Sequence, residues 1–213
     1  MKLNIDEALR YLGVREAPDG PMHREASALA QELQRRITPR FTWRAADLTS
    51  HSEFRIPNSE LSRRILADCH TAAVLVCTLG AEFDLWVRQL QMRDMARAAM
   101  LDALGSAYVE SGCDAAEDAI RARFPGKHLT DRFSPGYGDF PLAAQPELAA
   151  FAGASRIGVT VTDSLLMNPQ KSVTAVVGIA DTPQPARVRG CAHCPLKGRC
   201  SFSTPCNQQG GAR

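Results

Sequence analysis

The sequence contains no long hydrophobic run. Hydrophobic residues make up 45% of its 213 residues, which is enough for a sizeable core. The longest apolar stretch, residues 71–79, is far shorter than the ~20 residues that a membrane helix needs. The opening segment MKLNIDEALR has no apolar region of the kind found in signal peptides. We therefore expect a cytoplasmic protein with no signal peptide and no membrane partner.

The sequence also lacks a strong excess of charge of either sign. It has 25 Lys and Arg against 23 Asp and Glu, so its formal net charge is +2. A nucleic-acid-binding domain usually carries a dense basic face, so we expect no nucleic-acid partner. Internal repeats, a P-loop, a dinucleotide-binding glycine pattern and a Ser-His-Asp arrangement are also missing. Whether the chain is itself an enzyme is left open.

Hydrophobic periodicity predicts an α+β fold, with several helices packed on a small, mostly antiparallel sheet. Asn4 and Glu7 resemble a capping box at the start of the first helix. A long helical segment needs a break near Arg93 and Asp94. Helices are expected over residues 5–12, 22–37, 59–68, 81–124 and 146–152, and strands over residues 42–48, 72–77, 157–161 and 172–179. We assign residues 1–180 to one domain, 181–189 to a linker and 190–213 to a cysteine-rich tail.

A loop rich in proline and glycine carries the sharpest motif, RFSPGYGDFP, which begins at Arg132. Pro135 and Gly136 favour a type II turn, in which glycine takes a positive φ at low cost. Arg132 offers a planar fork to a carboxylate, and Tyr137 offers a flat ring with a polar tip. This combination suits an amphiphilic ligand with a carboxylate, although a stiff connector would use the same turn residues.

Residues 132–137 (RFSPGY) resemble the Arg-x-x-Pro-Gly-Tyr loop with which the activation domain of cobalamin-dependent methionine synthase holds S-adenosylmethionine. A second block lies on the expected side of the first. Residues 162–164 (TDS), 167–169 (MNP) and 172–174 (SVT) resemble that family's Thr-(Glu/Asp)-Ser, Met-x-Pro and Ser-Val-Ser segments. The chain is most similar to short standalone members, which lack the folate, homocysteine and cobalamin domains.

The resemblance implies an accessory factor for the reductive reactivation of cob(II)alamin. In the family, the domain docks over the corrin of its partner, a low-potential donor supplies an electron, and S-adenosylmethionine supplies a methyl group. The implied partner is a cobalamin-binding methionine synthase or a related corrinoid methyltransferase. The alternative is a module that docks on the corrinoid protein or relays electrons to it, without S-adenosylmethionine chemistry.

The resemblance also implies the site residues. The ligand contacts would come from Arg132, Tyr137 and the backbone of Pro135 and Gly136. Residues near the corrin face, or supporting the loop, would be Thr162, Asp163, Ser164 and Met167. Without the resemblance, the first three of these could form a self-capping turn, and the methionine could belong to the core.

The chain departs from the family pattern at two kinds of ligand. The family places an acid shortly before the arginine, where this sequence has only Asp131, and a second acid on the upstream helix, where Glu110 is the best candidate. The family's tyrosine in the last strand has no counterpart in residues 173–179. Loss of these ligands favours the docking module, whereas retention of Arg132 and Tyr137 favours the methyl-donor site.

Four of the seven cysteines crowd the tail, at Cys191, Cys194, Cys200 and Cys206. Reduced cytosolic thiols at such short spacings favour metal binding over disulfides. Four thiolates suit an iron–sulfur cluster, with structural zinc as the alternative. The nearby basic residues Arg187, Arg189, Lys197 and Arg199 would offset the thiolate charge. The remaining cysteines, Cys69, Cys77 and Cys113, lie on apolar segments and are expected to be buried thiols.

Anaerobic purification tests the metal assignment of the tail. We expect broad charge-transfer absorption that bleaches with dithionite, with iron and sulfide in equal amounts. Replacing Cys194 and Cys200 by serine should remove this spectrum and leave the fold of residues 1–180 intact. A colourless protein containing zinc would instead make the tail structural.

Overall fold

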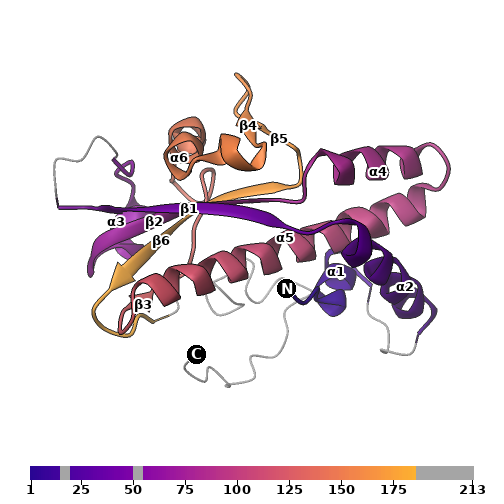
Figure 1. Ribbon diagram of the computed structural model, residues 1–213, viewed down its shortest axis with the longest axis horizontal. Helices are drawn as coiled ribbons and strands as arrows, with labels where there is room; N and C mark the ends of the chain where they lie inside the picture. The colour runs from indigo at the N-terminus through magenta and orange to yellow at the C-terminus, as the bar shows by residue number, and fades with distance from the viewer. Residues whose placement is uncertain (15–19, 50–54, 186–213) are drawn as a thin grey trace.

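A computed structural model describes residues 1–14, 20–49 and 55–185. Its main sheet is four-stranded, with the order β1-β2-β6-β3, and every neighbouring pair is antiparallel. Figure 1 shows the long helix α5 on one side of this sheet and α6 with the β4–β5 hairpin on the other. This arrangement confirms the predicted α+β class. No helix in these residue ranges is both long and apolar enough to cross a membrane.

The two central strands carry the core on both of their faces. They are β2 (Cys69–Thr78) and β6 (Ser172–Ala180), flanked by β1 (Arg40–Asp47) and the short β3 (His128–Leu129). Because side chains alternate along a strand, Leu75 packs in the cluster on the α5 side and Val74 in the cluster on the α6 side. A strand that is covered on both faces needs a continuous apolar run, which is why this part of the sheet was predictable.

Helix α5 (Met95–Arg123) packs on one face of the sheet, and α1 (Ile5–Tyr11), α2 (Pro21–Arg36) and α4 (Ala81–Gln91) pack against α5. The predicted cap of α1 is present, because the Asn4 side chain accepts a hydrogen bond of 3.0 Å from the Glu7 amide. The Glu7 carboxylate itself pairs with Arg10, one turn later. The predicted break between α4 and α5 is also confirmed, and Asp94 caps the second helix through the Arg97 amide at 2.9 Å.

The opposite face is covered by α3 (Glu60–Ile65), α6 (Gln145–Ala152) and a hairpin of β4 (Thr160–Val161) and β5 (Met167–Asn168). Short 3₁₀ helices, Leu142–Ala144 and Ala154–Ile157, flank α6. The expected strand over residues 157–161 was therefore wrong in its first half. Gly158 takes a left-handed conformation at φ 76°, which ends the 3₁₀ turn and delays the strand.

Helix α5 approaches α4 closely at Gly105. A Cβ atom added there would overlap the ring of Phe83, which is completely buried. We expect Gly105→Ala to lower the free energy of unfolding by about 1–3 kcal/mol, because the cost of overpacking exceeds the gain in helix propensity. Urea unfolding measures the change. The double variant Gly105→Ala/Phe83→Leu should recover part of the loss, and a stabilised single variant would contradict the packing argument.

Candidate functional site

Arg132 is buried and surrounded by carboxylates from α5. Its side chain is 8% exposed, and its Nη1 lies 2.7 Å from an oxygen of Asp114 and 2.5 Å from an oxygen of Glu117. Its Nη2 also pairs with Glu110. The three acids follow one another at four and three residues, so they lie on one face of α5. Arg132 and Glu110, which were each predicted to contact the ligand, therefore contact one another in the structure.

Arg132 points toward α5 because the side chain of the next residue, Phe133, points to the opposite, α6-side face of the sheet. Phe133 forms an isolated antiparallel bridge with Val176, in which its amide donates to the Val176 carbonyl at 3.0 Å. The Phe133 side chain is buried in the cluster on the α6 side and meets the Phe140 ring edge-on. Since consecutive side chains in extended backbone alternate, Arg132 lies on the α5 face of the sheet edge.

The charge balance around Arg132 keeps the guanidinium protonated. Burial lowers the pKa of Arg132, but the neighbouring Cys113 and the carboxylates of Glu117 and Glu110 raise it, and the net shift is upward. One guanidinium therefore faces three acids. Both terminal nitrogens are already engaged, so a carboxylate ligand that binds them would have to displace one of these partners.

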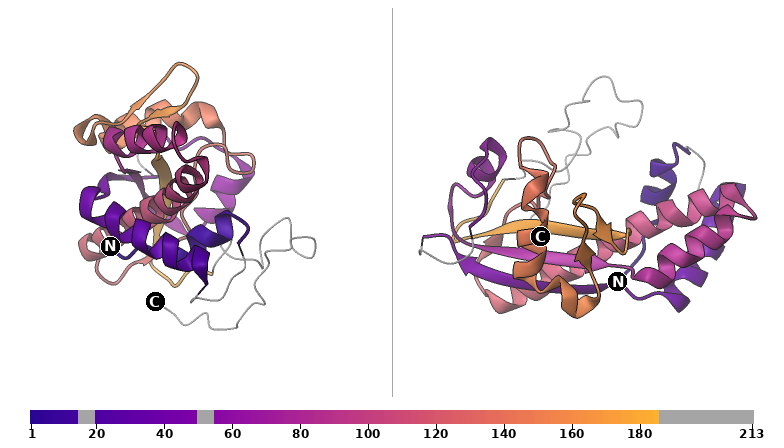
Figure 2. Two further views of the ribbon diagram at one scale, coloured as in Figure 1. Left: turned by 90° about the vertical axis from the view of Figure 1, so that its right-hand side faces the viewer. Right: turned by 90° about the horizontal axis from the view of Figure 1, so that it is seen from above.

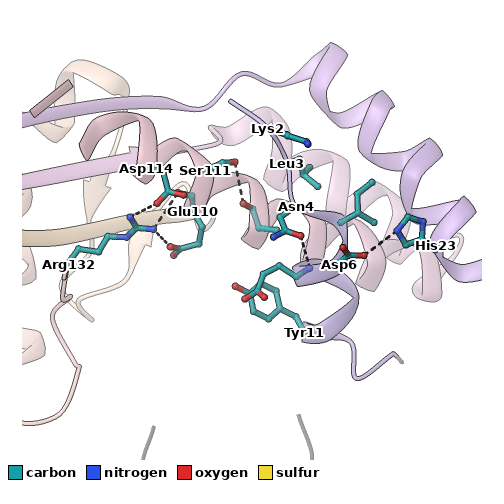
Figure 3. Close-up of a pocket in the computed structure, with 13 residues that line it drawn as sticks. Lys2, Leu3, Asn4, Asp6, Tyr11, His23, Glu110, Ser111, Asp114 and Arg132 are labelled. Carbon is teal, nitrogen blue, oxygen red and sulfur yellow. Dashed lines mark hydrogen bonds and ion pairs between the residues drawn. The ribbon is translucent and has the colours of Figure 1, made fainter. Parts of the chain in front are cut away.

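A pocket of about 690 Å³ lies between α1 and α5, with Arg132 at one end. This volume is within the range of small-molecule sites. Figure 3 shows Arg132, Glu110 and Asp114 on one side of the pocket and Tyr11 on the other. The pocket is lined by Lys2, Leu3, Asn4, Ile5, Asp6, Glu7, Tyr11, His23, Ala107, Glu110, Ser111, Asp114 and Arg132.

Helix α1 contributes the part of this pocket that the sequence did not reveal. The Asp6 carboxylate lies 3.3 Å from Nε2 of His23, and Glu7 accepts a hydrogen bond of 2.8 Å from Nε of Arg10. Burial, together with the hydrogen bond to Glu7, raises the pKa of Tyr11 to about 12, so its hydroxyl stays protonated. The capping pattern predicted α1 as a helix, but no sequence signal placed it against α5.

The predicted turn is present but lies outside this pocket. The Tyr137 amide donates to the Ser134 carbonyl at 3.1 Å, and Gly136 has φ 86°, as a type II turn requires. Pro135, Gly136 and Tyr137 are not among the residues that line the pocket, and Tyr137 is 59% exposed. Two of the predicted ligand residues, Arg132 and Glu110, therefore come together, whereas the turn residues stand apart from them.

Asp139 fastens this turn to α3. Its carboxylate accepts hydrogen bonds from the amides of Leu61, at 3.0 Å, and Glu60 at the start of that helix. These amide donors lower the pKa of Asp139. The predicted binding loop is thus held at both ends: Arg132 pairs with acids of α5, and Asp139 accepts hydrogen bonds from amides of α3.

The first two segments of the second sequence block lie in the β4–β5 hairpin and directly after it, on the opposite face of the sheet, and the third segment, residues 172–174, begins β6. The hydroxyls of Thr162 and Ser164 are 2.9 Å apart, and the Leu166 amide donates to the Thr162 hydroxyl at 3.1 Å, so the segment is a self-capping turn. Asp163 is exposed at this turn. Met167 packs in the α6-side cluster, and its sulfur accepts a hydrogen bond from the Thr174 hydroxyl. Figure 1 shows the hairpin and α5 on opposite sides of the sheet, and the views in Figure 2 agree.

The cysteines divide into two groups. Cys69, Cys77 and Cys113 are buried thiols, as predicted, and a hydrogen bond with Cys77 together with burial raises the pKa of Cys113. Cys191, Cys194, Cys200 and Cys206 lie outside the described residues. Within the ranges that the structure describes, no group of three His, Cys, Asp or Glu side chains is arranged to hold a metal ion.

Comparison with known proteins establishes the fold. No family model matches the sequence, and no curated protein matches it either. Among solved structures, the crystal structure of the MetH reactivation domain bound to AdoHcy matches with a TM-score of 0.56 and 13% sequence identity. The match covers 87% of this chain and 78% of that one. The chain therefore has the fold of the methionine synthase reactivation domain, as the motif resemblance predicted.

Removal of Arg132 should be costly, because it leaves Glu117 buried without its main partner. The Glu117 side chain is only 6% exposed. We expect Arg132→Met to lower the free energy of unfolding by about 3–5 kcal/mol, as measured by urea denaturation. The matched control is Arg121→Met, because Arg121 contacts the same Glu117 but is 45% exposed, and it should cost less than about 1 kcal/mol.

A double variant separates the loss of the ion pair from a loss of packing. Arg132→Met/Glu117→Met removes both charges and should be more stable than Arg132→Met alone. Equal stability of the single and double variants would show that the buried carboxylate is not the source of the cost.

Proposed function

We propose that the chain is an accessory factor for the reductive reactivation of cob(II)alamin, with S-adenosylmethionine as methyl donor. The observation that carries this proposal is a ligand-sized pocket that ends at Arg132, within the fold of a domain that was crystallised with AdoHcy. Arg132 is also the first residue of the motif that resembles the family's S-adenosylmethionine loop. The proposed partner is a cobalamin-bearing methionine synthase or another corrinoid protein.

The side chains of the pocket suit a zwitterionic ligand with an additional positive charge. Glu110 and Asp114 have side chains that are 44% and 60% exposed, so their carboxylates can accept hydrogen bonds from an ammonium group and can stabilise a sulfonium. Arg132 would hold the carboxylate of the ligand. Asp114, the most exposed of its three partners, is the one that a ligand carboxylate would displace most readily.

The remaining predicted site residues have proposed roles that can be tested separately. Tyr137, with Pro135 and Gly136, would contact the donor beyond Arg132, and its exposure leaves the ring accessible. The hairpin residues Thr162, Asp163, Ser164 and Met167 would form or support a contact with the partner's corrin domain. The electron would come from a low-potential donor or from an iron–sulfur cluster in the cysteine tail. In all of these steps, the chain's contribution is positioning and electrostatics.

A second candidate function is a module that docks on a corrinoid protein, or relays electrons to it, without S-adenosylmethionine chemistry. Two observations favour it. The two terminal nitrogens of Arg132 are already paired with three carboxylates, and the hairpin lies on the face of the sheet opposite the pocket. A flat corrin that contacts the hairpin would therefore not border the pocket at the same time.

Calorimetry with S-adenosylmethionine, with and without a corrinoid partner, decides between these functions. The wild-type chain should bind the ligand, and Glu110→Gln should weaken binding by about tenfold, because a charge-assisted hydrogen bond is lost. The matched control is Asp118→Asn, since Asp118 lies on α5 beside Arg121 but does not line the pocket. Its affinity should equal that of the wild type.

The opposite results have distinct meanings. No binding in either condition would contradict the methyl-donor site and would favour the docking module. Tighter binding by Glu110→Gln would mean that Glu110 competes with the ligand for Arg132 rather than holding the ligand itself. A reductive methylation assay on the partner's cob(II)alamin would then test whether the chain promotes reactivation at all.

A further inference from the structure

The pocket has a second wall, which the N-terminal segment and α1 supply. Leu3, Ala8 and Leu9 are buried in the cluster that contains α5, so α1 is fixed against that helix. This packing turns Asp6, Glu7 and Tyr11 toward the same pocket as Glu110 and Asp114. Figure 3 shows this wall facing Arg132 across the pocket.

Tyr11 is the aromatic residue of this wall. Among the described residues that line the pocket, it is the only one with a phenyl or phenol ring, and it is 46% exposed. His23, the other ring there, has Nε2 at 3.3 Å from Asp6 and Nδ1 at 3.3 Å from the Ser27 hydroxyl, and its side chain is only 19% exposed. An aromatic surface that borders a cavity is well suited to stack on a planar ligand group.

The Tyr11 ring is also held in a defined orientation. Glu7 lies near its hydroxyl and contributes to its raised pKa, and the Arg10 guanidinium lies over the ring at 5.2 Å from its centroid. Glu7 in turn binds Arg10, so the three side chains fix one another. A ring that is ordered before binding loses little conformational freedom when a ligand stacks on it.

We propose that Tyr11 determines the specificity of this pocket by stacking on the purine ring of an adenosyl ligand. The inference rests on the proposed function, because it assumes that the ligand carries an adenosyl group. Glu110 and Asp114 lie across the pocket, so the cationic part of the ligand lies toward α5 and the base lies toward α1. The ligand therefore bridges the two helices.

Equilibrium dialysis of the full chain with radiolabelled S-adenosylmethionine tests this assignment, with unlabelled adenosine and methionine as separate competitors. Tyr11→Ala should weaken the binding of S-adenosylmethionine and adenosine by about tenfold each, because a base–aromatic stack is lost. Competition by methionine should not change. Tyr11→Phe keeps the ring and should stay within about twofold of the wild type. The control Met92→Ala, at an exposed residue outside the pocket, should bind like the wild type.

The outcomes distinguish failure of this inference from failure of the proposed function. If the wild type binds S-adenosylmethionine and Tyr11→Ala binds it equally well, the stacking role is overturned and the methyl-donor site stands. If Tyr11→Phe loses as much affinity as Tyr11→Ala, or methionine loses as much as adenosine, stacking is likewise overturned. If the wild type binds neither S-adenosylmethionine nor adenosine, both proposals fall. Circular dichroism confirms that each variant remains folded.

Discussion

The ion pair between Arg132 and Glu117 links the edge of the sheet to α5, and the candidate site depends on that link. Both side chains are almost completely buried, so neither charge can be solvated if the other is lost. The pair fixes where the chain leaves the sheet after β3. Because α1 also packs directly on α5, the helix holds the α1 wall and the Arg132 end of the pocket in one arrangement.

Much of the fold could be predicted from local patterns. Three features follow from short-range physical requirements. Asn4 and Asp94 each cap a free amide where a helix begins, and the apolar run of β2 suits a strand that is covered on both faces. The resemblance of the loop to a known family singled out the arginine at residue 132 and the acid at residue 110 as separate ligand contacts, but it did not predict that they pair with each other.

The rest depended on contacts between segments far apart in the sequence. Asp114 and Glu117 follow Glu110 on a helix face that looks like an ordinary solvated stripe until Arg132 reaches it from the sheet edge. The same limit applies to Tyr11, because an exposed tyrosine at the end of a short helix carries no sign of the cavity beside it. It also applies to the hairpin, since the motif order along the chain does not say on which face of the sheet each block will lie.

The position of the N-terminal segment has a practical consequence. Lys2 and Leu3 belong to the wall of the pocket rather than to a distant surface. An affinity tag fused ahead of Met1 would begin at the pocket's rim, where it could shield the cavity or occupy it. A cleavable N-terminal tag, removed before any binding measurement, leaves the pocket open.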